Sequence, residues 1–362
     1  MVNLSFIQYS SIDNYNDAKR EENFDNFDWI VCEKIHGANF SFITNGDSIV
    51  CARRSSIIKS GEEFFGYQRI FKKYKDSIMD LWKVMNDQQK IRGLNKQIIV
   101  YGELFGGYYP HPLVKPVKDI KPVQKGIYYC PEIEWKAFDI NDGEDFVEWD
   151  TMKTLLNDSN VPFVGELSRG SFLECKDYNP EFSSTIPQEF HLPSFQNLNF
   201  MNKVEGIVIR PLKNLLTTKG DRVILKIKTQ DFDERTCGKV KPPEFSTLLE
   251  TSNDQGNANI SYLYNTGSYE KKVNSVNPKI FLSFVNKNRL ESVISKVGNL
   301  TQENKEQFIT LLFEDAMDDI NKCIDMKEKF SLMSKKNKKK VNRLLFAESK
   351  EVIQRYIEND KE

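Results

Sequence analysis

The chain has 362 residues and a formal net charge of −1, and 39% of its residues are hydrophobic, including 25 Phe and 14 Tyr. This apolar and aromatic content excludes a disordered chain and is enough to build the cores of two domains. Acidic and basic residues are nearly balanced, so the chain has no overall positive field. Any binding to nucleic acid must therefore use a local patch.

The N-terminus and the cysteines give no sign of export or of a membrane. The first residues lack the basic region and apolar core of a signal peptide, and no apolar stretch approaches the roughly 18 residues of a membrane span. The 6 cysteines are scattered singly and the chain has 3 histidines, which argues against a zinc site. We therefore expect an intracellular, cytoplasmic protein with reduced thiols and no membrane partner.

Residues 1–245 have the pattern of a strand-rich, mixed α/β region. An amphipathic helix is predicted from Tyr67 to Met85, where large apolar residues recur at spacings of three and four. The proline-rich segment 106–126 is expected to be a surface loop. Short β-type runs, with a hairpin turn after the second, predict strands over 28–33, 39–44, 48–53, 97–103, 134–140, 204–210 and 222–228.

The composition changes after residue 245. Two adjacent prolines and a polar run suggest a linker over 246–277, and helical spacing then predicts a small all-α domain over 278–362. Its run Lys335–Lys340 is interpreted as a solvated turn or tail, with a phosphate-contacting patch as the alternative. Three helices are predicted: one that opens at Pro278, one over 304–326 and one over 340–359.

The most informative residue is Lys34, which stands where an apolar run ends, in Cys32-Glu33-Lys34-Ile35-His36-Gly37-Ala38-Asn39. A lysine there, followed by a glycine that lets the backbone fold closely, is the arrangement of a covalent nucleotidyltransferase. Its amine would attack the α-phosphorus of a nucleotide and carry the nucleotide as a phosphoramidate. Only the unprotonated amine can attack, so such a site needs neighbours that favour that form.

Four further charged signatures stand at predicted strand ends, in a fixed order after Lys34. Each alone is more simply interpreted as a solvent-facing strand or loop residue. Their order and their shared position at strand ends point to a nucleotide site. The four are Arg53-Arg54, Tyr101-Gly102-Glu103, Glu205-Gly206-Ile207-Val208-Ile209-Arg210 and Lys226-Ile227-Lys228.

With these motifs the chain resembles the RNA ligase 2 family, which includes a phage enzyme and the trypanosome RNA-editing ligases. The resemblance runs from Phe6 to about Ile320. Its most specific part is His36, where DNA ligases and capping enzymes usually have Asp. It implies an α+β fold, with an N-terminal mixed α/β nucleotidyltransferase (adenylation, ATP-grasp-like) domain of antiparallel sheets and a small all-α C-terminal domain. Further similar segments are 62–67, 137–140, 222–228 and 288–296.

The resemblance implies a role for each residue of the nucleotide site. Lys34 would be the nucleophile and Glu205 a catalytic carboxylate that binds a divalent metal. Lys226 and Lys228 would be catalytic cations that bind the triphosphate, and Phe138 would stack on the adenine. The other expected nucleotide-binding residues are Glu33, Ile35, His36, Asn39, Arg54, which orients a phosphate, and Glu103, which holds the ribose.

A second set is expected to contact the RNA end. It consists of Tyr9, Gln124, Arg169, Arg289, Asp315 and Asp319, with Asp150 as a further candidate. Asp315 and Asp319 are four apart and share one helix face. With Arg289 and the lysine run, this face is expected to grip RNA or to order the domain that does. The alternative interpretation of that pair is a surface pair with no partner.

Two positions depart from the family pattern. Cys32 stands where the phage-type enzymes have an arginine, so the contact made by that arginine must be absent or replaced. Ala38 replaces the usual threonine and removes one hydroxyl donor.

We therefore expect an ATP-dependent RNA ligase that uses Mg²⁺, with Mn²⁺ as a possible substitute. It would act as a monomer on RNA with 3′-hydroxyl and 5′-phosphate ends, preferably at nicks in duplex RNA. Two alternatives stay open. One is a DNA ligase or capping guanylyltransferase, against which His36 and the helical C-terminal third argue. The other is an RNA-end-binding protein with a decayed site, which the intact set of charged residues opposes.

Overall fold

The computed structural model describes residues 4–10, 12–14, 24–92, 96–195, 201–217, 220–232 and 277–359. The chain divides into two compact units. The first comprises residues up to Phe232 with Ile294–Asn299, and the second comprises the rest. The linker expected over 246–277 lies outside the described residues except for Asn277.

The first unit contains two five-stranded sheets. Sheet A has the order β1-β10-β9-β2-β8 and sheet B the order β5-β4-β3-β6-β7. All pairings are antiparallel except that of β1 with β10, which confirms the expected fold class. The strands are β1 (Asp13–Asn14), β2 (Trp29–Glu33), β3 (Ala38–Thr44), β4 (Ile49–Arg53), β5 (Ser56–Ile57), β6 (Ile98–Gly106), β7 (Ile133–Asn141), β8 (Glu166–Gly170), β9 (Gly206–Pro211) and β10 (Leu225–Lys228).

One face of each sheet is turned toward the other sheet. Ile43 and Tyr101 of sheet B pack in one apolar cluster with Val208 of sheet A. Strand alternation then sends Trp29 and Ile207 of sheet A to its opposite face, where they pack in a second cluster. Lys226 and Lys228 lie on the same face of sheet A as Val208, and Glu103 lies on the same face of sheet B as Tyr101, so strand alternation directs all three toward the other sheet.

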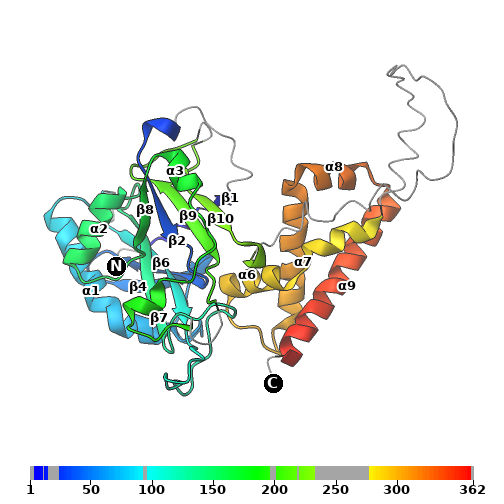
Figure 1. Cartoon of the computed structure of the whole chain (residues 1–362), viewed down its shortest axis with the longest axis horizontal. Helices are drawn as coiled ribbons and strands as arrows, with labels where there is room; N and C mark the ends of the chain where they lie inside the picture. The colour runs from blue at the N-terminus through cyan, green and yellow to red at the C-terminus, as the bar shows by residue number, and fades with distance from the viewer. Residues whose placement is uncertain are drawn as a thin grey trace. The chain divides into compact units, whose positions relative to one another are not determined.

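Helices cover the outer faces of the two sheets (Figure 1). Helix α1 (Tyr67–Asp87) packs against strands of sheet B, and α2 (Trp149–Asp158) packs beside α1 and β7. Helix α3 (Phe172–Lys176) lies against β2 and β8 of sheet A. The described part of this unit also contains the short helical segments η1 (Phe24–Asn26), α4 (Ile186–Glu189) and η3 (Gln230–Phe232).

The proline-rich connection between β6 and β7 has no helix or strand over residues 107–132, as its composition predicts. It is more buried than a simple surface loop, because Tyr109, Val123 and Tyr129 all lie in the interior. Backbone N–H groups of this region bond to one another's carbonyls and to strand ends.

The second unit is helical, as expected, but its helices have other bounds. A 3₁₀ helix, η5 (Pro278–Phe284), opens at Pro278 and is followed by α6 (Lys287–Val297), whose residues from Ile294 onward are counted with the first unit. The predicted helix over 304–326 is α7 (Lys305–Lys322), which ends because Cys323 is extended, and α8 (Ile324–Leu332) follows. Helix α9 spans Lys335–Asn359. Within the part of the chain that the structure describes, none of these helices combines the length and apolar composition needed to cross a bilayer.

The lysine run was expected to form a turn or tail, and this interpretation is wrong. Residues Lys335–Lys340 form the first turns of α9. A buried stripe of Val341, Leu345 and Ile353 continues along the same helix. The long apolar stripe stabilises the helix although positive charges at a helix N-terminus are unfavourable.

Candidate active site

Lys34 is held at the end of β2 by backbone contacts that require two glycines. Its backbone N–H donates to the carbonyl of Gly206 at 2.9 Å. Gly206 has φ +152°, and a Cβ there would lie 2.1 Å from the Ile227 oxygen. At Gly37 a Cβ would lie 1.9 Å from the Leu104 oxygen. The glycine after the lysine therefore permits the chain to pass directly against β6.

The side chain of Lys34 contacts the buried carboxylate of Glu205, the residue directly before β9 (Gly206–Pro211). Its Nζ lies 2.7 Å from Glu205 Oε2, and Nζ of Lys228 lies 2.9 Å from Glu205 Oε1. His36 Nδ1 lies 3.4 Å from Glu205 Oε2. One carboxylate from sheet A thus gathers two predicted cations and the family-specific histidine.

Glu205 is only 3% exposed. Burial alone would raise the pKa of Glu205, but the ammonium groups of Lys228 and Lys34 hold that pKa well below its usual value. The carboxylate is therefore ionised at neutral pH. A polyphosphate that entered this space would compete with Glu205 for the same ammonium groups.

Glu103 and Arg54 add a second pair of ionisable side chains to the site. Burial raises the pKa of Glu103 to about 8, against the opposing charges of Lys34 and Arg54 and a hydrogen bond from the Gly37 N–H. Burial likewise lowers the pKa of Arg54 from its usual value, although Glu103 opposes this. Asn39 stands directly across from Glu103 in the pairing of β3 with β6. These three residues therefore line the same region as Lys34.

A bulge in β7 directs Phe138 toward the space between the sheets. Tyr101 of β6 pairs with Asp139, whereas the next residue, Gly102, pairs with Ala137. Phe138 is the extra residue, and a bulge of this kind re-aims side chains. Its ring packs on Tyr9 with centroids 5.0 Å apart and stays partly exposed. The predicted stacking residue thus keeps part of its surface accessible.

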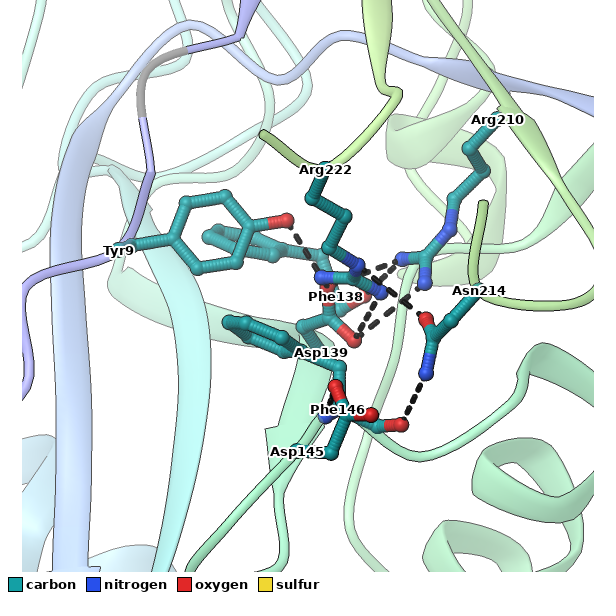
Figure 2. Close-up of polar contacts among 8 residues, drawn as sticks. All are labelled: Tyr9, Phe138, Asp139, Asp145, Phe146, Arg210, Asn214 and Arg222. Carbon is teal, nitrogen blue, oxygen red and sulfur yellow. Dashed lines mark hydrogen bonds and ion pairs between the residues drawn. The ribbon is translucent and has the colours of Figure 1, made fainter. Parts of the chain in front are cut away.

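Directly beside Phe138, Asp139 collects a buried polar network (Figure 2). Arg210 lies 3.3 Å from the Asp139 carboxylate, Arg222 also pairs with it, and Tyr9 donates its hydroxyl proton at 2.8 Å. Burial alone would raise the pKa of Asp139, but the two guanidinium groups hold it below its usual value. This network joins sheet B to sheet A.

Comparison with known proteins decides the family. The family model described as RNA ligase matches residues 27–228, more than half of the chain. The model described as T4 RNA ligase 2 C-terminal matches residues 270–351. The chain belongs to the RNA ligase family. The second match places it with the RNA ligase 2 enzymes. Membership of this family supports the expected RNA ligase activity.

Two relatives of this RNA ligase are trypanosomal. RNA-editing ligase 2, mitochondrial, of Trypanosoma brucei brucei is 28% identical over 354 residues, covering 88% of this chain and 83% of that protein. RNA-editing ligase 1, mitochondrial, of the same species is 28% identical over 344 residues, covering 82% and 71%. A solved structure of a Naegleria gruberi RNA ligase with PPi matches with a TM-score of 0.40 and 15% identity, over 63% of this chain and 57% of that chain.

Not every residue expected at the nucleotide site of the ligase reaches it. The Glu33 carboxylate accepts hydrogen bonds from the Ser184 hydroxyl at 2.6 Å and from the Thr185 N–H at 2.8 Å. Ile35 is buried in the core. The side chain of Glu33 therefore anchors the segment before α4 and does not join the Lys34 cluster. Lys226 lies on β10 opposite Val208, on the same face as Lys228.

Three expected RNA-end residues in the first unit have structural partners. Tyr9 is buried with its hydroxyl on Asp139, so it serves the interior and not an RNA surface. Arg169 of β8 forms ion pairs with Asp150 at 2.6 Å and with Glu166 at 2.8 Å. Gln124 is 8% exposed, within the connection between β6 and β7.

The structure also shows what surrounds Cys32. This buried residue pairs across the strands with Glu166, whose carboxylate accepts from Lys153 at 2.5 Å and from Arg169. Lys153 and Arg169 therefore both pair with Glu166, although residue 32 is a cysteine and supplies no positive charge.

In the second unit, Arg289 forms a buried triad with two aspartates. Arg289 is fully buried, with Nη1 2.6 Å from Asp315 Oδ2 and Nη2 2.7 Å from Asp319 Oδ2. Its Nε donates to the Phe284 carbonyl at 2.6 Å. The alternative of an aspartate pair without a partner is wrong. The buried Arg289 joins η5 and α6 to α7, which favours a face that orders the domain, and a role at the RNA end stays a prediction.

Sequence reasoning missed Asp139, Arg210 and Arg222 as members of one cluster. All three stand in or next to segments singled out for other reasons. The available signal was a charged residue inside an otherwise apolar strand, since buried charges require partners. The sequence does not show which partner each one takes.

Proposed function

We propose that this RNA ligase is ATP-dependent and joins 3′-hydroxyl and 5′-phosphate RNA ends through lysyl-AMP and 5′-adenylylated RNA. The observation that carries the proposal is the convergence of Lys34, Lys228 and His36 on Glu205. It supplies a nucleophilic amine and a polyphosphate-binding cation around one carboxylate. This is what a covalent nucleotidyl transfer needs from a protein.

In the first step, the Lys34 amine would attack the α-phosphorus of ATP. The amine must leave its ion pair with Glu205 and lose its proton before it can attack. A P–N bond then forms as the bond to the bridging oxygen breaks, and pyrophosphate leaves. Lys228 and Lys226 would neutralise the leaving phosphates. Phe138 would stack on the adenine.

Carboxylates at this site fit a role for Mg²⁺, with Mn²⁺ as a substitute. Among the described residues there is no group of three or more His, Cys, Asp or Glu side chains that could hold a metal alone. Mg²⁺ in nucleotide sites is commonly bound by one or two carboxylates together with substrate phosphates. Glu205, which is ionised at neutral pH, offers one such carboxylate. When bound, the ion would neutralise phosphate charge.

Two further displacements would complete the reaction. The 5′-phosphate oxygen of the RNA would attack the phosphorus of lysyl-AMP, forming a 5′-5′ pyrophosphate bond and releasing the Lys34 amine. The 3′-hydroxyl would then attack the RNA 5′-phosphorus, and AMP would leave. Arg54 and Asn39, which line the site near Glu103, would orient the phosphate and the end being joined.

For the RNA partner, we propose nicked duplex RNA bound by the monomeric ligase, with the helical C-terminal domain (278–362) as its RNA-end-binding part. Four exposed cations of α9, at positions 336, 339, 340 and 343, lie on the side away from the buried stripe. No described carboxylate forms an ion pair with them. Phosphate-rich RNA is the complement of such a stripe. The cytoplasmic location stays a prediction; both relatives are named as mitochondrial.

A sealing assay tests this proposal directly. Matched nicked duplexes would differ only in ribose or deoxyribose at the 3′-hydroxyl side, and each would be incubated with ATP and Mg²⁺. We expect rapid sealing of the ribose-ended nick, because the 2′-hydroxyl distinguishes RNA from DNA. Equal rates on an all-DNA nick would contradict RNA specificity. Sealing with GTP in place of ATP would contradict the choice of nucleotide.

A further inference from the structure

A buried ion cluster bridges the two sheets directly beside Phe138. Asp139 has no exposed surface, and both Arg210 and Arg222 are at most 7% exposed at the side chain. Asp139 belongs to β7 of sheet B, whereas Arg210 belongs to β9 of sheet A. Arg222 precedes β10 of sheet A. We call these three residues the intersheet clamp.

Stability alone does not explain the clamp. Removing three ionised groups from water is costly, and apolar residues of similar volume are often equally stabilising. Arg210 also has a buried Nε with no hydrogen-bond partner among the described residues. What the clamp does provide is directional contact. Arg222 stacks 3.9 Å from the ring centroid of Phe146, and Arg210 lies 5.0 Å from that of Trp149.

One of these directed contacts ends on Phe138 itself. Arg210 Nη1 donates to the Phe138 carbonyl at 2.9 Å and also bonds to Asp139, the next residue. The bulge that re-aims Phe138 is therefore held from sheet A, as Figure 2 shows. Bulged strands lack a regular ladder bond at the extra residue, so an outside donor fixes the bulge.

The two clamp arginines lie close in sequence to the charged residues of sheet A. Arg210 is on β9, which begins at Gly206 directly after Glu205. Arg222 leads into β10, which contains Lys226 and Lys228. The base-stacking ring comes from one sheet and the phosphate-binding cations from the other. The clamp is a direct polar connection between those two parts of the site.

We propose that the intersheet clamp positions Phe138 relative to the cations of β10, and so sets the affinity for the nucleotide. This inference rests on the proposed function. Asp139, Arg210 and Arg222 act through Phe138 and β10, so they are positioning residues. Tyr9 extends the clamp from the N-terminal segment, since its hydroxyl binds Asp139 and its ring packs edge-on against Phe138.

The test compares variants in single-turnover formation of the protein–AMP adduct at increasing ATP. Arg210→Lys keeps the charge but loses the planar fork that reaches both Asp139 and Phe138. We expect the ATP concentration for half-maximal rate to rise by about tenfold, while the rate at saturating ATP stays within about threefold. A variant with an unchanged half-saturating concentration, or with a loss confined to the maximal rate, would overturn the proposal.

A milder variant and its control keep the proposal testable if Arg210→Lys does not fold. Tyr9→Phe removes one hydroxyl from Asp139 and keeps the ring, and we expect a smaller rise in half-saturating ATP, about threefold. Tyr74→Phe removes a tyrosine hydroxyl from another buried carboxylate, Glu134, where the bond is 3.0 Å. It should leave the half-saturating concentration unchanged. Equal effects of both tyrosine variants would mean that the clamp is merely structural.

The wild-type protein separates this proposal from the proposed function. If the wild type forms no adduct with any nucleotide, the proposed function fails and the clamp proposal fails with it. If the wild type forms the adduct but Arg210→Lys and Tyr9→Phe behave like wild type, only the clamp proposal fails. Equilibrium binding of ATP to the Lys34→Ala variant, with and without Arg210→Lys, gives the same comparison without turnover.

Discussion

Lys34 Nζ lies 2.7 Å from Glu205 Oε2, although the two residues are 171 positions apart in the chain. The contact forms because β2 pairs with β9 in sheet A, which brings the ends of these strands together. The backbone N–H of Lys34 also bonds to Gly206, next to Glu205. The nucleophile is therefore fixed to its carboxylate through both main chain and side chain.

Replacing Glu205 should damage both the fold and the chemistry. Glu205→Gln leaves Lys34 and Lys228 without their shared negative charge, and breaking a buried ion pair in this way costs about 3–5 kcal/mol of unfolding free energy. Denaturant unfolding and adduct formation should both show the loss. Glu132→Gln, which changes an exposed carboxylate, is the matched control. Wild-type stability of Glu205→Gln would contradict the ion cluster.

The glycine after the nucleophile gives a steric prediction. In Gly37→Ala the added Cβ would meet the Leu104 oxygen at 1.9 Å, so the segment that carries Lys34 must move. We expect adduct formation to slow by about 100-fold, since small misplacements of reacting groups are costly. Gly165→Ala is the control, because a Cβ there has no neighbour within 4 Å. Similar rates for both variants would refute the steric argument.

Glu103 should make stability depend on pH. Its folded-state pKa is about 8 against an ordinary 4.5, so the folded state holds a proton that the unfolded state releases between these values. Linkage then predicts that this group lowers stability as pH rises from about 4.5 to 8, with no further effect above. Glu103→Gln removes the titration. Thermal unfolding of both proteins across that range should show a steeper decline for wild type; parallel curves would contradict the assignment.

The basic stripe of α9 should contribute salt-dependent RNA binding. Replacing Lys336, Lys340 and Arg343 by Ala removes three exposed cations. The slope of log affinity against log salt should fall by about 2 to 3, with weaker binding of nicked duplex RNA. Adduct formation without RNA should be unchanged. The matched control replaces Arg69, Lys72 and Lys75, three exposed cations of α1. An equal loss in the control would show a general charge effect.

The sequence predicted the local elements of the first unit well, because alternation and helical spacing are local signals. The strand expected over 39–44 is β3 (Ala38–Thr44), and the helix predicted from Tyr67 to Met85 is α1 (Tyr67–Asp87). The helices α2, α3 and α4 and the short strands β1 and β5 were missed, and so was the strand β8. Its sequence Glu-Leu-Ser-Arg-Gly has one apolar residue, and it forms through pairing with β2. Nonlocal pairing overrode the weak propensity of this segment.

In the second unit the errors have a similar cause. The break between α7 and α8 falls at Cys323, whose backbone is extended, and no glycine or proline marks it. The charge of the lysine run suggests a solvated turn, but the buried residues farther along α9 stabilise a helix there. Tertiary burial, which a residue pattern shows only in part, decided both points.

Within the site, the sequence identified strand-end charges but not their pairing. Lys34, Glu205 and Lys228 were expected together and lie together. Glu33 was expected there too, but strand alternation sends its side chain away, toward Ser184. The partners of Asp139 depend on how the two sheets stack, and strand patterns carry no information about that stacking.

The most direct test of the account is to map the covalent nucleotide. The protein would be incubated with labelled ATP and Mg²⁺, denatured, digested and analysed by mass spectrometry, beside Lys34→Ala and the control Lys203→Ala. We predict an AMP adduct on the peptide that contains Lys34, present in wild type and Lys203→Ala and absent from Lys34→Ala. Lys34→Ala should still seal RNA that already carries a 5′-adenylate. A normal yield of adduct in Lys34→Ala, or AMP on another residue of wild type, would contradict the central claim that Lys34 is the nucleophile.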